Sequence, residues 1–389
     1  MNIKKPIGII YDFDKTYRPY SIWYDLLVIF KNSCDNNPYL LLSQINAVDF
    51  FKNNKDIGFS NMPEKYKDDI RNNKSNIVMI QLYEGYSGMS GNEDLEIIEK
   101  WCIKENFPFN SVHYICGNLI VKSIFDKKKL NFNVYSIQNF EKSNDRKNTT
   151  IYFSPDNKKY LYLLYNRVPR ENRIFLINEL IEKGLFEFGA ISLNCKKNFV
   201  KPQYMSNTTF DFILNNCPFY TNKKVNLDIN QAAGIVVIDY EKTFLSIVTE
   251  TLIDKDTLFI SEKTWKPIIM GHPFIIYGNQ NTLKYLKGLG YKTFDRWIDE
   301  SYDLEEDTIA RCKLIVKEIE KISKYSIDKL KDIREDMYEI CEFNRKYFNQ
   351  QLNKNYVGNT NLNIINILND IWNELIKDKE VFYKKRELI

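Results

Sequence analysis

Two aspartates follow the first apolar stretch of the chain closely enough to act together. Residues 7–11, IGIIY, lead directly into the sequence DFDKT, in which a single residue separates Asp12 from Asp14. Carboxylates at the tip of a buried strand can act as a nucleophile or hold a divalent cation. They can equally be solvated side chains at an ordinary strand end. The residues alone leave these three interpretations open.

The segment resembles the D-x-D-x-T motif of haloacid-dehalogenase-type phosphatases and the metal-binding D-x-D motif of some glycosyltransferases. Such a phosphatase needs a second acidic motif after another apolar strand, but the only Asp-Asp pair, Asp68-Asp69, lies in a polar segment that we expect to be helical. A metal-binding D-x-D normally lies well inside a nucleotide-binding domain, whereas only eleven residues precede Asp12. We therefore expect Asp12 and Asp14 to end a strand or to serve an acceptor. A phosphohydrolase that uses Asp12 is kept as an alternative.

A later stretch carries a more specific pattern. Residues 258–278 read LFISEKTWKPIIMGHPFIIYG, which predicts a loop, a helix and a buried strand. The N-terminus of such a helix attracts an anionic phosphate. Lys263 can add a positive charge for a diphosphate, and Glu262 can accept hydrogen bonds from ribose hydroxyls. A capped amphipathic helix with ordinary surface charges would give the same pattern.

In order and spacing, this stretch resembles the donor-binding motif of α-1,3/4-fucosyltransferases and related glycosyltransferases. The match runs through Ser261, Glu262, Lys263, Gly271 and Gly278. One departure is Pro267, which falls inside the expected helix although proline is tolerated only in a first turn. We therefore expect the helix to begin later than in the family, near Lys266.

Two further elements upstream resemble the same family. In YNRVPRENRIFLINEL, residues 165–180, an Asn follows a predicted strand and an Arg opens the next helix; these are Asn166 and Arg173. An Arg at a helix start can bind a diphosphate with two hydrogen bonds. Arg167 and Arg170 are neighbouring alternatives or surface charges. Glu250 lies about where the family places a glutamate before the motif.

The resemblance implies an α/β fold of the GT-B type, with two facing Rossmann-like domains and a helical C-terminal tail. It implies an inverting, metal-independent transfer of fucose or another hexose or pentose from a nucleotide-diphosphate sugar, GDP-linked in the family, to a hydroxyl of a glycan or another acceptor. It implies no metal and no cofactor besides this co-substrate. A non-catalytic protein that binds nucleotide sugars or carbohydrates is the remaining alternative. The implied donor-binding residues are Asn166, Arg173, Glu250, Ser261, Glu262 and Lys263.

The catalytic base implied by this resemblance is a carboxylate at a strand end of the N-terminal domain, within reach of an acceptor hydroxyl. Glu84 follows the apolar stretch IVMIQLY and precedes a glycine, so it is the first candidate. Asp12 and Asp14 are the second candidates. A solvated glutamate in a turn explains Glu84 equally well.

Composition limits the class of protein. The chain has 389 residues, 44% apolar and 27% charged, and a net charge of +4. This predicts a globular protein of about two domains, with too little positive charge to indicate a nucleic-acid binder, although a nucleic-acid acceptor is compatible with it. No apolar run is long enough to predict a membrane span or a signal peptide. Seven cysteines without C-x-x-C spacing and two histidines predict a reduced, cytoplasmic protein without a zinc site.

The order of predicted elements indicates two α/β domains. Short apolar strands alternate with amphipathic helices on both sides of a charged linker at residues 141–150. We expect an acceptor-side domain at 1–150, a nucleotide-sugar-binding domain at 151–350, and a C-terminal helix at 351–389 that crosses back to the first domain. The expected strands are 7–13, 75–84, 111–118, 159–166, 189–194, 234–240 and 272–278, and the expected helices include 21–32, 92–105, 173–184 and 362–377.

Overall fold

The chain divides into two compact units. This computed structural model describes residues 8–10, 39–44, 62–81, 93–138, 158–195, 199–221, 235–253, 255–357 and 360–386. Unit 1 comprises Met1–Asn139 and Asn353–Ile389, and unit 2 comprises Phe140–Leu352. Each contains one parallel sheet with helices packed on it, so the α/β fold class predicted from the alternation of strands and helices is confirmed. The expected linker at 141–150 and the expected helix at 21–32 lie outside the described residues.

The sheet of unit 1 contains five described strands, all parallel and in chain order. The strands expected at 7–13, 75–84 and 111–118 correspond to β1, β3 and β4. Two more strands, β2 and β5, were not predicted, because a short apolar run alone does not distinguish a strand from a helix. The strands are β1 (Gly8–Ile10), β2 (Tyr39–Gln44), β3 (Ser75–Gln81), β4 (Val112–Cys116) and β5 (Asn133–Ser136).

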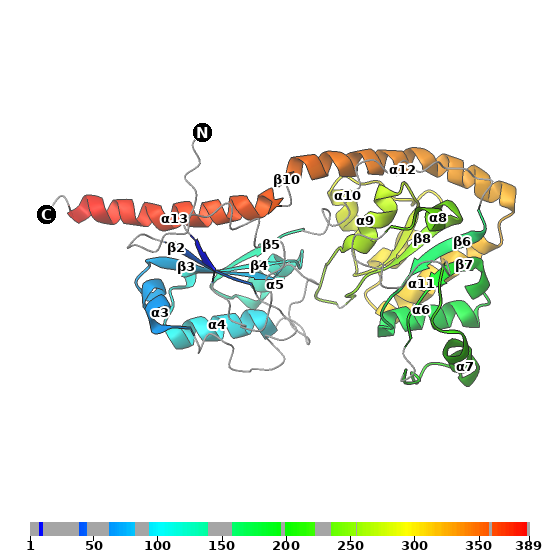
Figure 1. Ribbon diagram of the computed structural model, residues 1–389, viewed down its shortest axis with the longest axis horizontal. Helices are drawn as coiled ribbons and strands as arrows, with labels where there is room; N and C mark the ends of the chain where they lie inside the picture. The colour runs from blue at the N-terminus through cyan, green and yellow to red at the C-terminus, as the bar shows by residue number, and fades with distance from the viewer. Residues whose placement is uncertain are drawn as a thin grey trace. The chain divides into compact units, whose positions relative to one another are not determined.

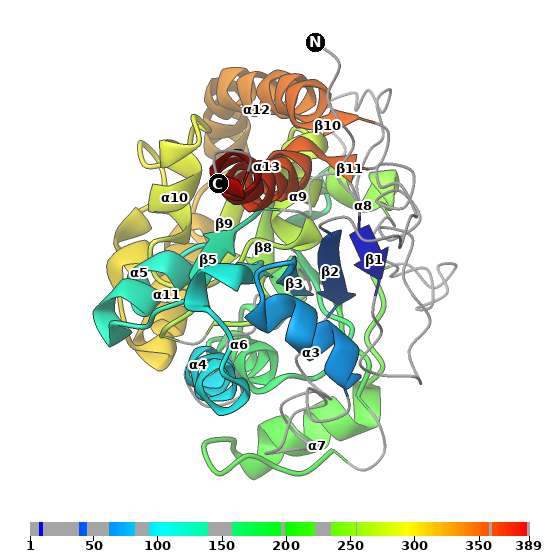
Figure 2. The ribbon, with the colours of Figure 1, turned by 90° about the vertical axis from the view of Figure 1, so that its left-hand side faces the viewer.

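Helices cover both faces of this sheet. Side chains alternate along β3, so that Ile77 and Met79 pack with α3, α4 and α5, while Val78 and Ile80 pack with the C-terminal helix α13. Figure 1 and Figure 2 show α13 on the opposite side of the sheet from α3 and α4. Burying each large aliphatic side chain of α13, such as Leu368, contributes about 1.5–3 kcal/mol. The helices are α3 (Glu64–Arg71), α4 (Glu93–Glu105), α5 (Val121–Lys128) and α13 (Leu362–Arg386).

Helix α3 tests the phosphatase interpretation of the Asp12–Thr16 segment. Asp68 and Asp69 lie in this helix, as the polar composition of the segment predicted, and not at the tip of a strand. They are therefore not placed as the second acidic motif of a haloacid-dehalogenase-type phosphatase would be.

The sheet of unit 2 contains four described strands, all parallel, in the order β7-β6-β8-β9. The chain runs from β6 to β7 on one side and then crosses to β8 on the other side. The strand order therefore reverses between β6 and β8, and in open α/β sheets ligands bind outside the carboxyl ends of the strands at such a point. The strands are β6 (Tyr160–Tyr165), β7 (Gly189–Ser192), β8 (Thr243–Thr249) and β9 (Phe274–Tyr277).

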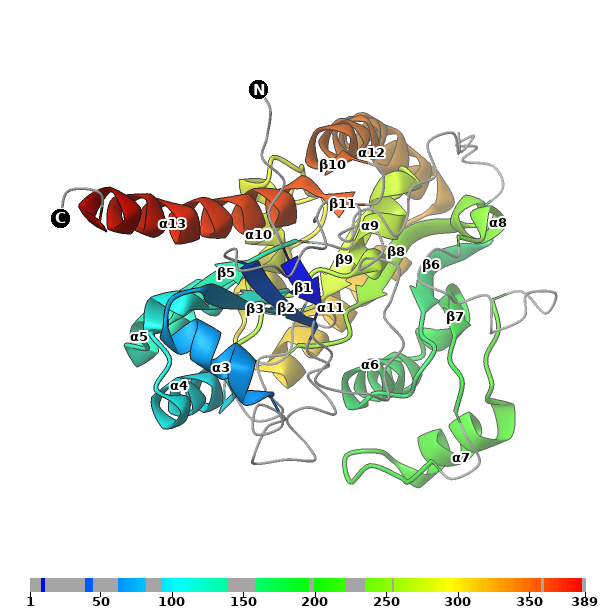
Figure 3. The same ribbon diagram turned by 60° about the vertical axis from the view of Figure 1, so that its left-hand side comes forward.

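Figure 3 shows α6 and α11 against one face of this sheet and α8 and α9 against the other. The long helix α12 packs on α9, where the rings of Phe348 and Trp265 are 5.6 Å apart. Among the described residues, no helix combines the length and apolar character needed to cross a membrane. The helices are α6 (Glu171–Glu182), α7 (Asn207–Asn216), α8 (Val237–Glu241), α9 (Glu262–Ile269), α10 (Thr282–Gly288), α11 (Thr308–Ser323) and α12 (Ile327–Asn355). A two-stranded ribbon, β10 (Tyr356–Val357) and β11 (Thr360–Asn361), links α12 to α13.

The strand expected at 234–240 is wrong. Val237–Glu241 form the short helix α8, and the strand is the following segment, β8, in which every residue is buried. Within α8 the carboxylate of Asp239 accepts hydrogen bonds from the hydroxyls of Tyr165 and Thr221, both at 2.6 Å. Residues 235–241 therefore lead into the strand and carry the buried carboxylate of Asp239, although their apolar run also suited a strand.

Both histidines of the chain are buried, one in each unit, and we expect neither to titrate at neutral pH. Burial lowers the pKa of His113 to about 3. Burial also lowers the pKa of His272 well below its usual value, and the nearby charges of Arg334 and Lys158 lower it further. Because both pKa values are lower when folded, their contribution to stability is full above about pH 6.5 and is lost as pH falls toward the folded pKa. NMR titration of the imidazole protons should show two histidines that remain neutral at about pH 5, whereas a midpoint near about 6.5 for either would contradict this burial.

Candidate functional site

The carboxyl ends of β6 and β8 bring two predicted residues together at the point where the strand order reverses. Asn166 follows β6 and Glu250 follows β8, and both are almost fully buried. The hydroxyl of Thr249, the last residue of β8, donates to the side-chain oxygen of Asn166. The side-chain nitrogen of Asn166 is also buried and has no hydrogen-bond partner among the described residues. Such a donor needs an acceptor, which a water or a ligand oxygen can supply.

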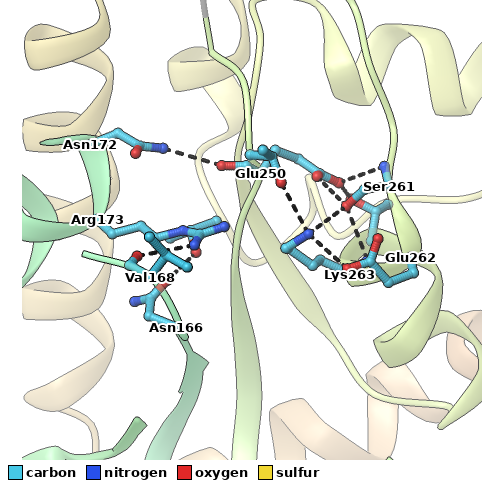
Figure 4. A network of polar contacts seen from close by, with 11 residues as sticks. Asn166, Val168, Asn172, Arg173, Glu250, Ser261, Glu262 and Lys263 are labelled. Atoms are coloured by element: carbon cyan, nitrogen blue, oxygen red, sulfur yellow. Dashed lines mark hydrogen bonds and ion pairs between the residues drawn. The ribbon is translucent and has the colours of Figure 1, made fainter. Parts of the chain in front are cut away.

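The carboxylate of Glu250 has no exposed surface and is satisfied by the start of α9 (Figure 4). One oxygen accepts hydrogen bonds from the backbone N–H of Ser261 at 3.1 Å and from the hydroxyl of Thr264 at 2.7 Å. The other oxygen accepts from the hydroxyl of Ser261. A carboxylate this deeply buried is tolerated only when hydrogen-bond donors replace its water. Glu250 therefore holds α9 against the end of β8.

Helix α9 begins at Glu262 and not near Lys266, so the predicted late start is wrong. Ser261 is the N-cap residue, and its hydroxyl oxygen accepts from the backbone N–H of Lys263 at 3.2 Å. Pro267 lies in the second turn, where it cannot donate to the carbonyl four residues earlier. The cap and the Glu250 carboxylate favour the early start, and the helix ends two residues after the proline.

The same contacts change the expected role of the helix end. Glu250 supplies a negative charge beside the N-terminus of α9, where the sequence suggested a phosphate. The N–H groups of Ser261 and Lys263 are already bonded within the protein. The side chains around the helix end, more than its backbone, are therefore what this edge offers to an anionic ligand.

Lys263 is the most accessible predicted cation of the motif. Its side chain is 25% exposed, and its ammonium lies 2.7 Å from a carboxylate oxygen of Glu262. It also donates to the hydroxyls of Thr251 at 3.1 Å and Ser261 at 3.2 Å. Burial opposes ionisation of Glu262, but the charge and hydrogen bond of Lys263, with Lys266 nearby, outweigh it and lower the pKa of Glu262. Glu262 and Lys263 are therefore an ion pair at neutral pH.

The predicted arginine lies behind this edge. Arg173, in the first turn of α6, is 3% exposed and donates to the backbone oxygen of Val168 at 3.2 Å. In Figure 4 its guanidinium and the ammonium of Lys263 point toward one another from α6 and α9. Arg167, one of the neighbouring alternatives, is exposed, and the other, Arg170, is half-buried.

Neighbours that the sequence did not single out complete the arrangement. Asn172, beside Arg173, donates its side-chain N–H to the backbone oxygen of Glu250 at 3.2 Å. Gly278, after β9, allows the Glu250 side chain to pack closely against the backbone. A Cβ at this position would lie 3.1 Å from the hydroxyl of Thr282 and 3.4 Å from Glu250 Cγ. The spacing of the motif indicates the glycine, but no local signal indicates Asn172.

The three candidate catalytic carboxylates, Asp12, Asp14 and Glu84, lie outside the described residues. The strands before them are described: β1 ends at Ile10 and β3 at Gln81, and both are parallel to β2, which lies between them. The chain therefore leaves both strands at one edge of the sheet, about 10 Å apart. Among the described residues, no three His, Cys, Asp or Glu side chains come together in a way that could hold a metal ion.

No protein-family model and no curated protein matches the chain. Among solved structures, the chain is similar to a mutant of T4 phage BGT in complex with UDP-glucose. The two chains are 14% identical, the match covers 83% of this chain and 84% of that one, and the TM-score is 0.37. This score is too low for the similarity to assign a fold or a function.

We expect Glu250→Gln to destabilise the protein by about 2 kcal/mol or more. Glutamine keeps the shape but replaces one acceptor oxygen with an N–H₂ group that faces the donors of Ser261 or Thr264, leaving buried groups unsatisfied. Urea denaturation of the full chain measures the loss. Glu262→Gln, a neighbouring glutamate on the surface side of the same turn, is the matched control and should cost clearly less. Equal losses would contradict the assigned role of Glu250.

Proposed function

We propose that the chain is a glycosyltransferase of the GT-B type that moves a sugar from a nucleotide-diphosphate sugar to a hydroxyl acceptor. The proposal rests on the groups that meet at the carboxyl edge of the unit 2 sheet. There the reversal of strand order coincides with the unsatisfied amide of Asn166 and the partly exposed ammonium of Lys263. Ligands of open α/β sheets bind at such a point, and an amide donor and a cation at the same sheet edge suit phosphate oxygens.

In this proposal each group has a distinct task. The Lys263 ammonium contacts the diphosphate, and the Asn166 amide donates to a diphosphate or ribose oxygen. Glu262 accepts hydrogen bonds from ribose hydroxyls while its charge balances Lys263. Arg173 and Glu250 are positioning residues that do not contact the donor. Arg173 binds the loop at Val168, and Glu250 binds the start of α9.

The reaction proposed is inverting and metal-independent. The acceptor hydroxyl attacks the anomeric carbon as a carboxylate of unit 1, Glu84 or else Asp12 or Asp14, removes its proton. The bond from the anomeric carbon to the diphosphate breaks, and Lys263 stabilises the charge that develops on the departing diphosphate. Fucose linked to GDP is the proposed donor by resemblance, and the acceptor is a glycan or another hydroxyl compound.

A nucleotide screen tests the proposal. We expect one of GDP, UDP, ADP and CMP to raise the melting temperature of the full chain, with the same shift when EDTA is present. A ligand at about one hundred times its Kd stabilises the folded state by about 2.7 kcal/mol. Release of that nucleotide from its sugar, only when an acceptor hydroxyl is present, would then identify a transferase. Binding without turnover across an acceptor panel would instead indicate the non-catalytic alternative.

Substitution of the cation locates the site. Lys263→Gln should weaken binding of the selected nucleotide about tenfold, since a charge-assisted contact to phosphate is worth about 1.4 kcal/mol or more. Lys313→Gln, an exposed lysine of α11, is the matched control and should leave binding unchanged. Unchanged binding in Lys263→Gln, or a thermal shift that requires magnesium, would overturn the assignment.

A further inference from the structure

Two cysteines face each other just beyond the end of β7. Leu193, the residue after β7, pairs with Phe219 in an isolated antiparallel bridge, with backbone hydrogen bonds in both directions. Two residues further along each segment, this register places Cys195 opposite Cys217. The backbone N–H of Cys195 donates to Cys217 Sγ at 3.0 Å, so the two residues are in contact.

Among the cysteines that the structure describes, only this pair is half-buried, and both members are free thiols. The other described cysteines are at most 2% exposed. Burial raises the pKa of Cys102 to about 12 and that of Cys341 to about 11, so these thiols stay protonated at neutral pH. Since the thiolate is the nucleophile in cysteine chemistry, a reagent in solvent will meet the exposed pair first. The buried cysteines are Cys102, Cys116, Cys312 and Cys341.

The two sulfurs are not equivalent, because donors gather at Cys217. The thiol of Cys195 donates to the Cys217 sulfur, and the backbone N–H groups of Cys195 and Phe219 add to this, so the pKa of Cys217 is lowered although burial opposes ionisation. The same contact raises the pKa of Cys195, which stays a thiol. When Cys217 is protonated, its own thiol donates to the backbone oxygen of Leu193 at 3.4 Å. One sulfur is therefore prepared to react first, with the other beside it.

We propose that Cys195 and Cys217 form a reversible redox site, at which hydrogen peroxide converts the two thiols into a disulfide. The Cys217 thiolate attacks one peroxide oxygen, the O–O bond breaks, and the departing hydroxide takes a proton from solvent, which leaves a sulfenic acid on Cys217. The Cys195 sulfur then attacks Cys217 Sγ. The S–S bond forms, the S–O bond breaks, and the second hydroxide takes the Cys195 proton. Two thiols and one peroxide thus give one disulfide and two waters, and a dithiol reductant restores the thiols.

The disulfide joins two segments near the carboxyl edge of the unit 2 sheet. The backbone N–H of Asn194, next to Cys195, donates to the backbone oxygen of Arg167 at 3.1 Å. The backbone N–H of Asn166 donates to the backbone oxygen of Ser192 at 3.0 Å. Oxidation therefore ties down the segment that borders Asn166 and Arg167. The inference uses only the cysteine pair and does not depend on the proposed transferase activity.

Peptide mapping of the full chain tests the proposal. The reduced chain is treated with hydrogen peroxide, the remaining thiols are alkylated with iodoacetamide, and the denatured product is digested with trypsin. Cleavage after Lys196 and Lys197 puts the two cysteines on separate peptides, residues 184–196 and 198–223, so only a disulfide keeps them together. We expect the linked pair of peptides as the main product, and its loss after treatment with dithiothreitol.

Two other products would overturn the proposal. One is a disulfide between either cysteine and Cys34, which lies outside the described residues. The other is a chain in which peptides 184–196 and 198–223 stay unlinked, whether their cysteines are unmodified or oxidised to sulfinic acid.

Single substitutions assign the order of the two steps. In Cys195→Ser the sulfenic acid on Cys217 has no partner, so dimedone should trap it, whereas Cys217→Ser should give no dimedone adduct on Cys195. Cys102→Ala removes a buried cysteine and is the matched control, which should leave the linked peptides unchanged. Circular dichroism establishes that each variant is folded. Equal dimedone adducts in the two serine variants would overturn the assignment of Cys217 as the first sulfur to react.

Discussion

The buried carboxylate of Glu250 is the interaction on which the carboxyl edge of unit 2 depends. A carboxylate without access to water is stable only if protein donors surround it, and here those donors come from Ser261 and Thr264 at the start of α9. The backbone N–H of Glu250 donates to the backbone oxygen of Tyr277 at the end of β9, and the backbone oxygen of Glu250 accepts from the side chain of Asn172 on α6. One residue therefore joins two strands and two helices where the strand order reverses.

This arrangement determines which groups remain for a ligand. Because Glu250 supplies the negative charge at the N-terminus of α9, a bound phosphate would not meet an unoccupied helix end. The Ser261 hydroxyl donates to Glu250 and accepts from the Lys263 ammonium, so the same network sets the direction of the lysine side chain. Recognition of an anion at this edge then rests on side chains, chiefly the partly exposed ammonium of Lys263 and the buried amide of Asn166.

The sequence indicates those parts of the site that depend on local pattern. Apolar runs bounded by turn residues predict β6 and β9. The start of α9 was expected too late, near Lys266, because Pro267 was expected to lie in the first turn. The strand expected at 234–240 failed because an apolar run of that length suits a strand or a short buried helix. The contact between Thr249 and Asn166 spans 83 residues, and only the strand order places β8 beside β6. No pattern in the sequence indicates that Arg173 turns back to Val168, since helical position does not fix where a long side chain ends.

Helix α9 connects the two edges of the unit 2 sheet. Its eight residues include a proline, which removes one backbone hydrogen bond and makes the helix unfavourable in isolation. Opposite charges compensate at its two ends: the Glu250 carboxylate binds the start, and the Arg334 guanidinium donates to the backbone oxygen of Gly271, just beyond the last turn. A negative charge at the start and a positive charge at the end both interact favourably with the helix macrodipole. Glu250 also belongs to the candidate donor site, so a charge that stabilises this short helix is the same group that shapes the carboxyl edge of the sheet.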